Sequence, residues 1–264
     1  MDLSTLSMTE IVRLQNELQQ ELARRFERRL LMVFSDIVGS TPYFARFGDA
    51  MGRQLHQLHF DLIEQSFGPQ QGRLVDAVGD GAFCVFPDAE AGVRGVVALH
   101  QAIARANAVR QRPHQMSLRI GLHWGPVLTD GQTVTGDAVH VAARVARIAE
   151  PGAVVLTRGA YQELGPRARL HCHSLGTREL KGVAEPVEVL ELDWRDPVAF
   201  PRRVTIDETG ETLDLPQQDI VSFGRLPEHD GARANDILLN HPDPERARRI
   251  SCWHFELRDR KSVV

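Results

Sequence analysis

Two aspartates, Asp36 and Asp80, are the residues whose type and setting first point to chemistry in this 264-residue chain. Asp36 closes a largely apolar run at residues 31–36, and Asp80 stands between two glycines with apolar residues on both sides. Carboxylates at neighbouring strand ends are suited to hold two divalent cations for phosphoryl chemistry. Mg²⁺ needs only one or two carboxylates beside substrate phosphates. The alternative is a hairpin-turn Asp and an unrelated strand-end Asp.

The sequence around these aspartates predicts the elements that must position them. Residues 72–86 form two apolar runs around an Asp-Gly step, which predicts a β-hairpin. Apolar residues at helical spacing predict helices over 42–67 and 89–109, and alternation predicts a strand over 117–123. The order β-α-β-β-α-β is typical of a ferredoxin-like palm, so the predicted fold class is α+β. His56 and His59 on the first helix are interpreted as solvent-facing or core residues.

The residues beside both aspartates resemble the two metal-binding motifs of class III adenylate and guanylate cyclases. The matching segments are Phe34-Ser-Asp-Ile-Val-Gly-Ser-Thr41 and Val78-Gly-Asp-Gly81. The resemblance covers residues 30–194, because later family motifs follow in order. These are His123-Trp-Gly125, an Ala-rich helix with Arg144, and a Leu180-Lys-Gly182 turn.

The resemblance implies conversion of ATP or GTP to the 3′,5′-cyclic monophosphate and pyrophosphate, with two Mg²⁺ or Mn²⁺ ions per active site. Asp36, Asp80 and the backbone carbonyl of Ile37 would bind the metals. Arg144 matches the arginine that meets charge developing at the α-phosphate, a task that suits a planar guanidinium. Lys181 matches a phosphate-contacting lysine. A surface arginine and a turn lysine are the alternatives for these two positions.

Three positions depart from the family pattern. His140 replaces an asparagine that helps to fix the ribose, so we expect altered and pH-sensitive activity. Asp76 occupies a base-reading position that is lysine in adenylate cyclases and glutamate in guanylate cyclases. An ionised carboxylate accepts hydrogen bonds, which favours guanine, although aspartate is shorter than glutamate. Thr133, at the second base-reading position, both donates and accepts. The choice between ATP and GTP therefore stays open.

The family's active site lies between two chains, which implies a homodimer. Asp36 and Asp80 of one subunit would meet the remaining site residues of the other. The N-terminal segment, residues 1–28, carries an apolar stripe that predicts an amphipathic helix. The stripe consists of Ile11, Leu14, Leu18, Leu22 and Phe26. A short parallel coiled coil and packing on the same domain are both compatible with it.

A third region, residues 195–264, follows the cyclase-like region at 29–194, with the boundary expected at residues 193–197. Short predicted strands there carry Phe223-Gly-Arg225 and Ile250-Ser-Cys-Trp-His254, which resemble the first half of a forkhead-associated (FHA) domain. By this resemblance Arg225 and Ser251 contact the phosphate of a phosphothreonine protein. The chain ends at Val264, before the family's remaining strands, so a half sandwich with unpaired edges is expected.

Composition excludes several other classes of protein. A net charge of −4 provides no global basic field for nucleic acid. The three cysteines show no metal-ligand spacing and suit a reducing cytoplasm. No apolar run approaches the roughly 20 residues of a membrane span. The leading hypothesis is a cytoplasmic nucleotide cyclase. An inactive cyclase-like scaffold or sensor and a phosphothreonine-binding adaptor are the alternatives.

Overall fold

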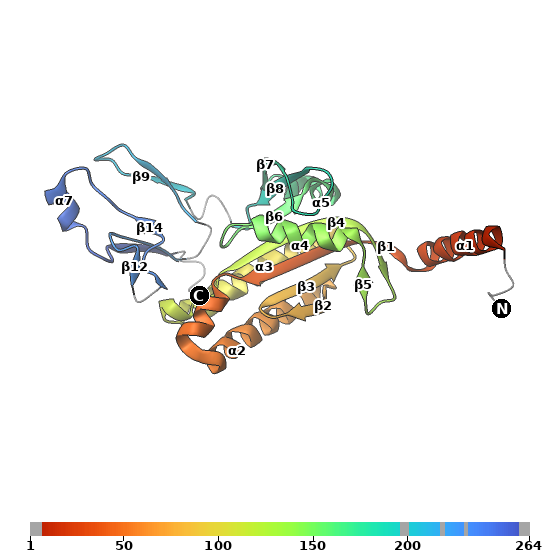
Figure 1. Ribbon diagram of the computed structural model, residues 1–264. Helices are drawn as coiled ribbons and strands as arrows, with labels where there is room; N and C mark the ends of the chain where they lie inside the picture. Colours follow the sequence, from red (N-terminus) through yellow and green to blue (C-terminus); the bar gives the residue numbers. More distant parts are fainter. Residues whose placement is uncertain (1–6, 196–200, 217–219, 230–231, 259–264) are drawn as a thin grey trace.

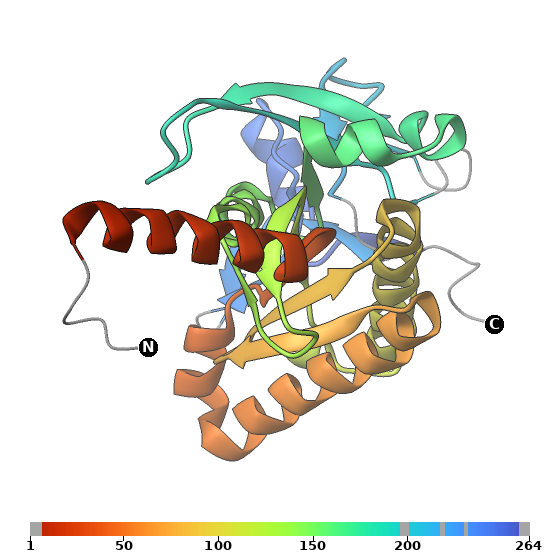
Figure 2. The same cartoon turned by 90° about the vertical axis from the view of Figure 1, so that its right-hand side faces the viewer.

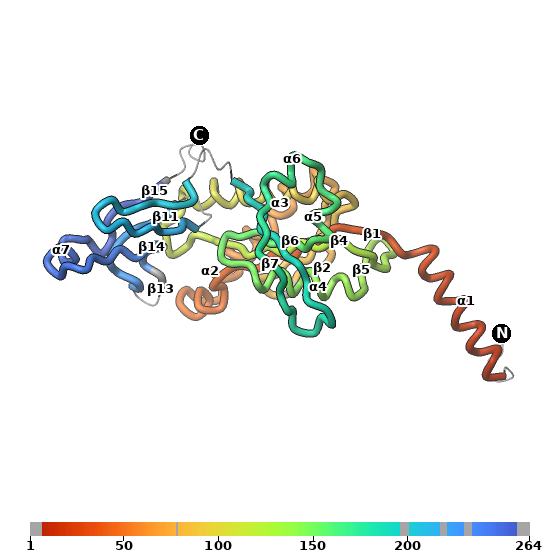
Figure 3. Tube along the Cα trace, turned by 90° about the horizontal axis from the view of Figure 1, so that it is seen from above, coloured from red at the N-terminus to blue at the C-terminus, as the bar shows by residue number. Residues whose placement is uncertain are grey.

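The computed structural model describes residues 7–195, 201–216, 220–229 and 232–258 (Figure 1). A central module of one sheet and its helices lies between an N-terminal helix and a set of C-terminal strands (Figures 1 and 3). The boundary expected at 193–197 lies partly outside the described residues. None of the described helices is both long and apolar enough to cross a lipid bilayer.

The central sheet contains eight strands in the order β2-β3-β1-β4-β6-β8-β7, with β5 paired to β4. Its first four strands are β1 (Glu27–Ile37), β2 (Arg73–Val78), β3 (Gly81–Phe86) and β4 (Leu118–Thr129). The others are β5 (Val134–Thr135), β6 (Val154–Thr157), β7 (Cys172–Arg178) and β8 (Val187–Leu192). β1 pairs antiparallel with both β3 and β4. With α2 and α3 between its strands, this is the predicted βαββαβ palm, and the α+β class is confirmed.

The two faces of the sheet carry different helices (Figure 2). Alternate β1 residues, Leu31 and Val33, join the main core beneath α2 (Ser40–Phe67) and α3 (Ala89–Ala108). The intervening Met32 packs on the opposite face with Ala138 and Ala142 of α4 (Asp137–Ile148). The short helices α5 (Arg158–Glu163) and α6 (Pro166–Arg169) follow β6.

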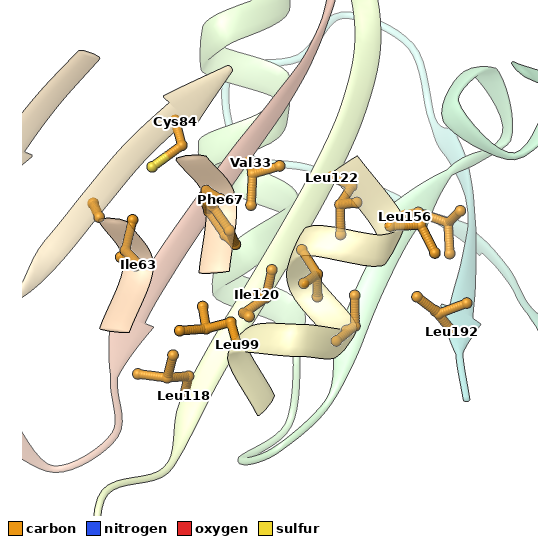
Figure 4. Packing of buried hydrophobic residues seen from close by; sticks show 14 of the residues in the cluster. Val33, Ile63, Phe67, Cys84, Leu99, Leu118, Ile120, Leu122, Leu156 and Leu192 are labelled. Atoms are coloured by element: carbon orange, nitrogen blue, oxygen red, sulfur yellow. The ribbon is translucent and has the colours of Figure 1, made fainter. Parts of the chain in front are cut away.

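The main core is built from aliphatic and aromatic side chains of the inner strands and helices (Figure 4). Ile120 and Leu122 of β4 are fully buried, and complete burial of such a side chain contributes roughly 1.5–3 kcal/mol. Gly121 between them faces α4. A Cβ there would lie 2.1 Å from the backbone nitrogen of Ala146, so only glycine lets the helix approach this closely. Close packing of α4 on β4 places the helix firmly on the sheet.

Helix α1 (Met8–Phe26) begins with a capping box formed by Ser7 and Glu10. It has no buried residue, and the exposed side chains include Leu18 and Leu22. The prediction of a helix to residue 28 was wrong by two residues. From Glu27 onward the chain pairs with β4, beginning opposite Leu128, and this tertiary pairing ends the helix.

The described residues of the C-terminal region form three small sheets. β9 (Arg203–Thr205) pairs with β10 (Thr212–Asp214), and β12 (Glu228–His229) pairs with β13 (Ala232–Arg233). β11 (Ile220–Gly224) lies between β14 (Ile237–Leu238) and β15 (Phe255–Arg258), with α7 (Pro244–Arg249) before β15. Leu215, Val221 and Phe223 form their core. An ion pair of 2.9 Å between Arg112 and Asp236 connects this region to the palm.

Candidate active site

The structure brings Asp36 and Asp80 together at one end of the sheet. β1 runs antiparallel to β3 with Ser35 opposite Ala82, so the β2–β3 turn lies beside the end of β1. Burial raises the pKa of Asp36, and the negative charge of Asp80 together with a hydrogen bond between the two side chains raises it further. The pairing of β1 with β3 thus brings together two carboxyl groups that are distant in sequence, one at the end of a strand and one in a hairpin turn.

The chain leaves β1 through a turn that only glycine adopts easily. Gly39 has a φ of 73° and precedes the first residue of α2. This left-handed residue lets α2 begin at Ser40, four residues after Asp36, without carrying the strand further. The acidic pair therefore lies where the end of strand β1, the β2–β3 hairpin and the start of helix α2 meet.

Arg119 is a site residue that sequence reasoning missed. It lies directly opposite Asp36 in the β1–β4 pairing, and its Nη2 donates to Asp36 Oδ2 at 2.7 Å. This guanidinium lowers the pKa of Asp36 but does not cancel the opposing effects of burial and Asp80. The sequence signal that could have identified Arg119 is a pair of opposite charges on neighbouring strands. That signal can be recognised only once the register of β1 on β4 is known.

The acidic pair fits divalent cations. Carboxylate oxygens are the ligands that Mg²⁺ and Mn²⁺ prefer. Burial raises the pKa of Asp36 most, and the charge of Asp80 raises it further, an effect that a cation bound by both carboxylates would offset. Within the described residues, no group of three or more His, Cys, Asp or Glu side chains is arranged to hold a metal. Two carboxylates alone suit an ion that takes its remaining ligands from substrate phosphates and water.

The two candidate base-reading residues lie on exposed parts of the chain. Asp76 follows an irregularity in β2, and its Oδ1 accepts from the Ala77 backbone at 2.8 Å. Thr133 precedes β5, and its hydroxyl donates to Asp130 Oδ1 at 3.0 Å. Both hydrogen bonds are local, so each side chain is held by its own loop or strand and is exposed to solvent.

The three candidate phosphate- and ribose-binding residues lie on α4 and the β7–β8 hairpin. His140 and Arg144 are four residues apart on α4, a spacing that puts them on the same side of the helix. Lys181 is exposed and borders an open hollow of about 510 Å³ at the hairpin turn. Among the described residues, no hydrogen bond or ion pair joins any of the three to Asp36 or Asp80. One chain thus presents two separate sets of candidate residues.

The structure also brings together the two candidate phosphopeptide residues of the C-terminal region. The backbone nitrogen of Arg225 donates to the carbonyl of Ser251 at 3.0 Å, and both residues are exposed. The backbone nitrogen of His254 donates to the Phe223 carbonyl at 2.7 Å, which holds the second motif against β11.

Comparisons with known proteins agree on the central module. The profile described as adenylate and guanylate cyclase catalytic domain matches residues 24–191. The relative named "Putative adenylate cyclase 3" from Rhizobium meliloti is 26% identical over 200 residues, covering 75% of this chain and 34% of that protein. The chain therefore spans about a third of this relative's length.

Solved structures share the fold of this module. The crystal structure of an adenylate/guanylate cyclase/hydrolase from Silicibacter pomeroyi is 26% identical with a TM-score of 0.55, covering 63% of this chain and 96% of that one. A Trypanosoma brucei adenylate cyclase structure, in its monomeric state, is 22% identical with a TM-score of 0.55, covering 63% of this chain and 90% of that one. At 22% identity, the likeness to the Trypanosoma brucei structure shows a shared fold alone.

Proposed function

This chain belongs to the family of adenylate and guanylate cyclase catalytic domains, and we propose that it converts ATP or GTP to the 3′,5′-cyclic monophosphate and pyrophosphate. Family membership supports nucleotide cyclase activity. The observation that carries the proposal for this chain is the adjacency of Asp36 and Asp80, whose side chains interact. A structural role alone does not account for an Asp80 placed where its charge raises the pKa of Asp36.

The reaction needs the ribose 3′-hydroxyl in line with the α-phosphorus while pyrophosphate departs. Asp36 and Asp80, with the Ile37 carbonyl, would hold two Mg²⁺ or Mn²⁺ ions. When bound, these ions supply charge neutralisation and a lower pKa for the attacking hydroxyl. Arg144 donates to the α-phosphate oxygens as their charge grows, and Lys181 binds the remaining phosphates. His140 hydrogen-bonds the ribose and so helps to orient its hydroxyl.

We assign the acidic pair and the cationic residues of one active site to two copies of the chain. Within one chain, Arg144 and Lys181 make no described contact with Asp36 or Asp80, although both are accessible at the surface. A symmetric homodimer would bring each acidic pair to the partner's cationic residues and create two equivalent sites. The reaction would then require dimerisation. The three free cysteines suit a reducing cytoplasm as its location.

The test is complementation between two inactive variants, Asp36→Ala and Arg144→Ala. Mixed after dissociation, they should recover about a quarter of wild-type activity, because half of the dimers are mixed and each has one intact site. A chain carrying both substitutions should be rescued by neither single variant and serves as the matched control. Assays use Mn²⁺ with ATP or GTP. Absence of recovery, despite mixed dimers, would contradict the shared site.

An inactive scaffold or sensor is the competing role of the same module. His140 and Asp76, which depart from the family pattern, are its support. Wild-type protein that forms stable dimers, yet turns over neither ATP nor GTP with Mg²⁺ or Mn²⁺, would favour this alternative.

We also propose that the C-terminal region binds phosphothreonine peptides. The contact between the backbones of Arg225 and Ser251 supports this role, because it places a guanidinium-bearing residue and a hydroxyl-bearing residue side by side on the surface. The full chain should bind a phosphothreonine peptide library, and Arg225→Ala should abolish that binding without changing cyclase turnover. Equal binding of the unphosphorylated peptides would contradict it.

A further inference from the structure

His59, on the long helix α2, is a fully buried polar residue in the main core. It lies on the same helix face as Leu55, Leu62 and Ile63, all of which are buried. A buried imidazole is costly unless its nitrogen atoms find partners. An aliphatic side chain would fill this position without burying a polar group. The histidine is therefore expected to have a specific role.

The contacts of His59 lead to the segment that carries Asp36. Its Nε2 lies 3.0 Å from the hydroxyl of Ser35, a buried residue that immediately precedes Asp36 on β1. Ser35 in turn pairs with Ala82 of β3, two residues after Asp80. His59 therefore holds the point of β1 where the two carboxylate-bearing segments come together, although they are 44 residues apart in sequence by the numbers of Asp36 and Asp80.

Geometry distinguishes His59 from Arg119. The guanidinium of Arg119 forms an ion pair with Asp36 itself. His59 instead holds the residue before Asp36, through a hydrogen bond between two buried side chains. His59 therefore acts on the backbone that carries Asp36 and leaves the carboxylate available to a cation.

We propose that His59 is a positioning residue that sets the separation and orientation of Asp36 and Asp80 for divalent cations, through its hydrogen bond to Ser35 at the point where β1 pairs with β3. This inference rests on the proposed function, in which the acidic pair binds the metals. It extends the site to a helix that supplies none of the metal ligands. In metal sites generally, residues that hydrogen-bond to the metal ligands fix the orientation of those ligands.

The test measures Mn²⁺ binding to the full-length protein by electron paramagnetic resonance, with 3′-deoxy-ATP and 3′-deoxy-GTP as substrates that cannot cyclise. His59→Leu fills most of the space without hydrogen bonds and should weaken Mn²⁺ binding about tenfold. His59→Gln keeps one hydrogen-bonding group and should recover part of the loss. In turnover assays, the KM for Mn²⁺ should rise by more than kcat falls.

The matched control is His100→Leu on α3. His100 is also buried, but it stacks on Trp194 with ring centroids 4.3 Å apart and has no described contact with the acidic pair. This variant should lower the Tm and leave Mn²⁺ affinity unchanged. If His59→Leu fails to fold, Ser35→Ala removes the same hydrogen bond while the imidazole remains, and it should also weaken Mn²⁺ binding.

Two results would overturn the inference in distinguishable ways. If His59→Leu and Ser35→Ala bind Mn²⁺ like the wild type while Asp36→Ala does not, the metal site stands and His59 is only a core residue. If Asp36→Ala itself binds Mn²⁺ like the wild type, the proposed metal site is wrong, and the role of His59 falls with it.

Discussion

The end of the sheet that carries Asp36 and Asp80 differs in construction from the surface that carries His140, Arg144 and Lys181. The acidic end is partly buried and internally connected, since Arg119, Ser35 and His59 contact it or its neighbours. The cationic surface is built on α4 and a hairpin, and its polar side chains have no described contact with the acidic end. One half of the proposed site is held in place by the fold, whereas the other faces outward.

This difference indicates which half should tolerate change. Residues of the acidic end depend on one another, so a substitution there is expected to alter neighbouring residues as well as function. The side chains of His140, Arg144 and Lys181 make no described hydrogen bond or ion pair within the chain, so their substitution should change catalysis with little effect on folding. Stability and activity measured on the same variants therefore test the comparison directly.

The largest effect is expected from Arg144→Ala. Removal of a donor that meets charge in the transition state should lower kcat about 100- to 1,000-fold. The Tm should stay within about 2 °C of the wild type, because the half-buried Arg144 has no described hydrogen bond or ion pair within the chain, and substitutions away from such interactions usually change stability by at most about 0.5 kcal/mol. Steady-state kinetics and calorimetry measure the two quantities. A large fall in Tm would show that Arg144 supports the fold, and would remove the contrast between the two regions.

A second prediction concerns Asp76 and Thr133, the two exposed candidates for base recognition. Asp76→Lys combined with Thr133→Asp should shift the ratio of kcat/KM between ATP and GTP by about tenfold toward ATP, since a hydrogen bond to a charged group contributes roughly 1.5–3 kcal/mol. Parallel assays with both nucleotides measure the ratio. Asp130→Ala is the control, because it removes the partner of Thr133 without placing a new charge at either position. An unchanged ratio would remove Asp76 from base recognition.

Local patterns in the sequence were sufficient for the palm and for the two aspartates. The Asp-Gly turn and the apolar runs predicted the β2–β3 hairpin, and helical spacing predicted α2 and α3 within a few residues. Arg119 and His59 were not identified as neighbours of the site. Their positions depend on the register between β1 and β4 and on which side of α2 faces the hairpin turn. Such tertiary relations leave no local periodicity. The end of α1 was misjudged for the same reason.

A third, smaller effect is expected from His140→Asn. This substitution places the family's usual residue on α4, and the exposed position should accept it without strain. If His140 orients the ribose imperfectly, kcat should rise about two- to fivefold, which corresponds to roughly 0.4–1 kcal/mol in the barrier. Turnover at saturating nucleotide provides the measurement. A fall in kcat would mean that the remainder of the site has adapted to histidine.

The smallest expected effect is on stability at the acidic end. The folded state raises the pKa of Asp36 above its unfolded value, so the fold favours the protonated carboxyl. The contribution of the Asp36 carboxyl to the stability of the fold is therefore fully present below its unfolded pKa, near 3.9. It is lost as the pH rises through the raised pKa of the folded state. At neutral pH the ionised carboxylate disfavours folding. Asp36→Asn keeps the shape of the side chain and removes its negative charge. This is the same charge that forms the ion pair with Arg119.

Chemical denaturation in EDTA, at pH 7 and near pH 3, should therefore show a stabilised Asp36→Asn variant at pH 7 and a smaller difference at pH 3, where the wild-type carboxyl is protonated. The matched control is Asp76→Asn, which removes one negative charge from an exposed position of β2 and should have little effect at either pH. A destabilised Asp36→Asn at pH 7 would mean that the ion pair with Arg119 outweighs burial and the repulsion from Asp80. In that case the acidic end would be stabilised by its own charges, and its need for cations would no longer follow from the fold.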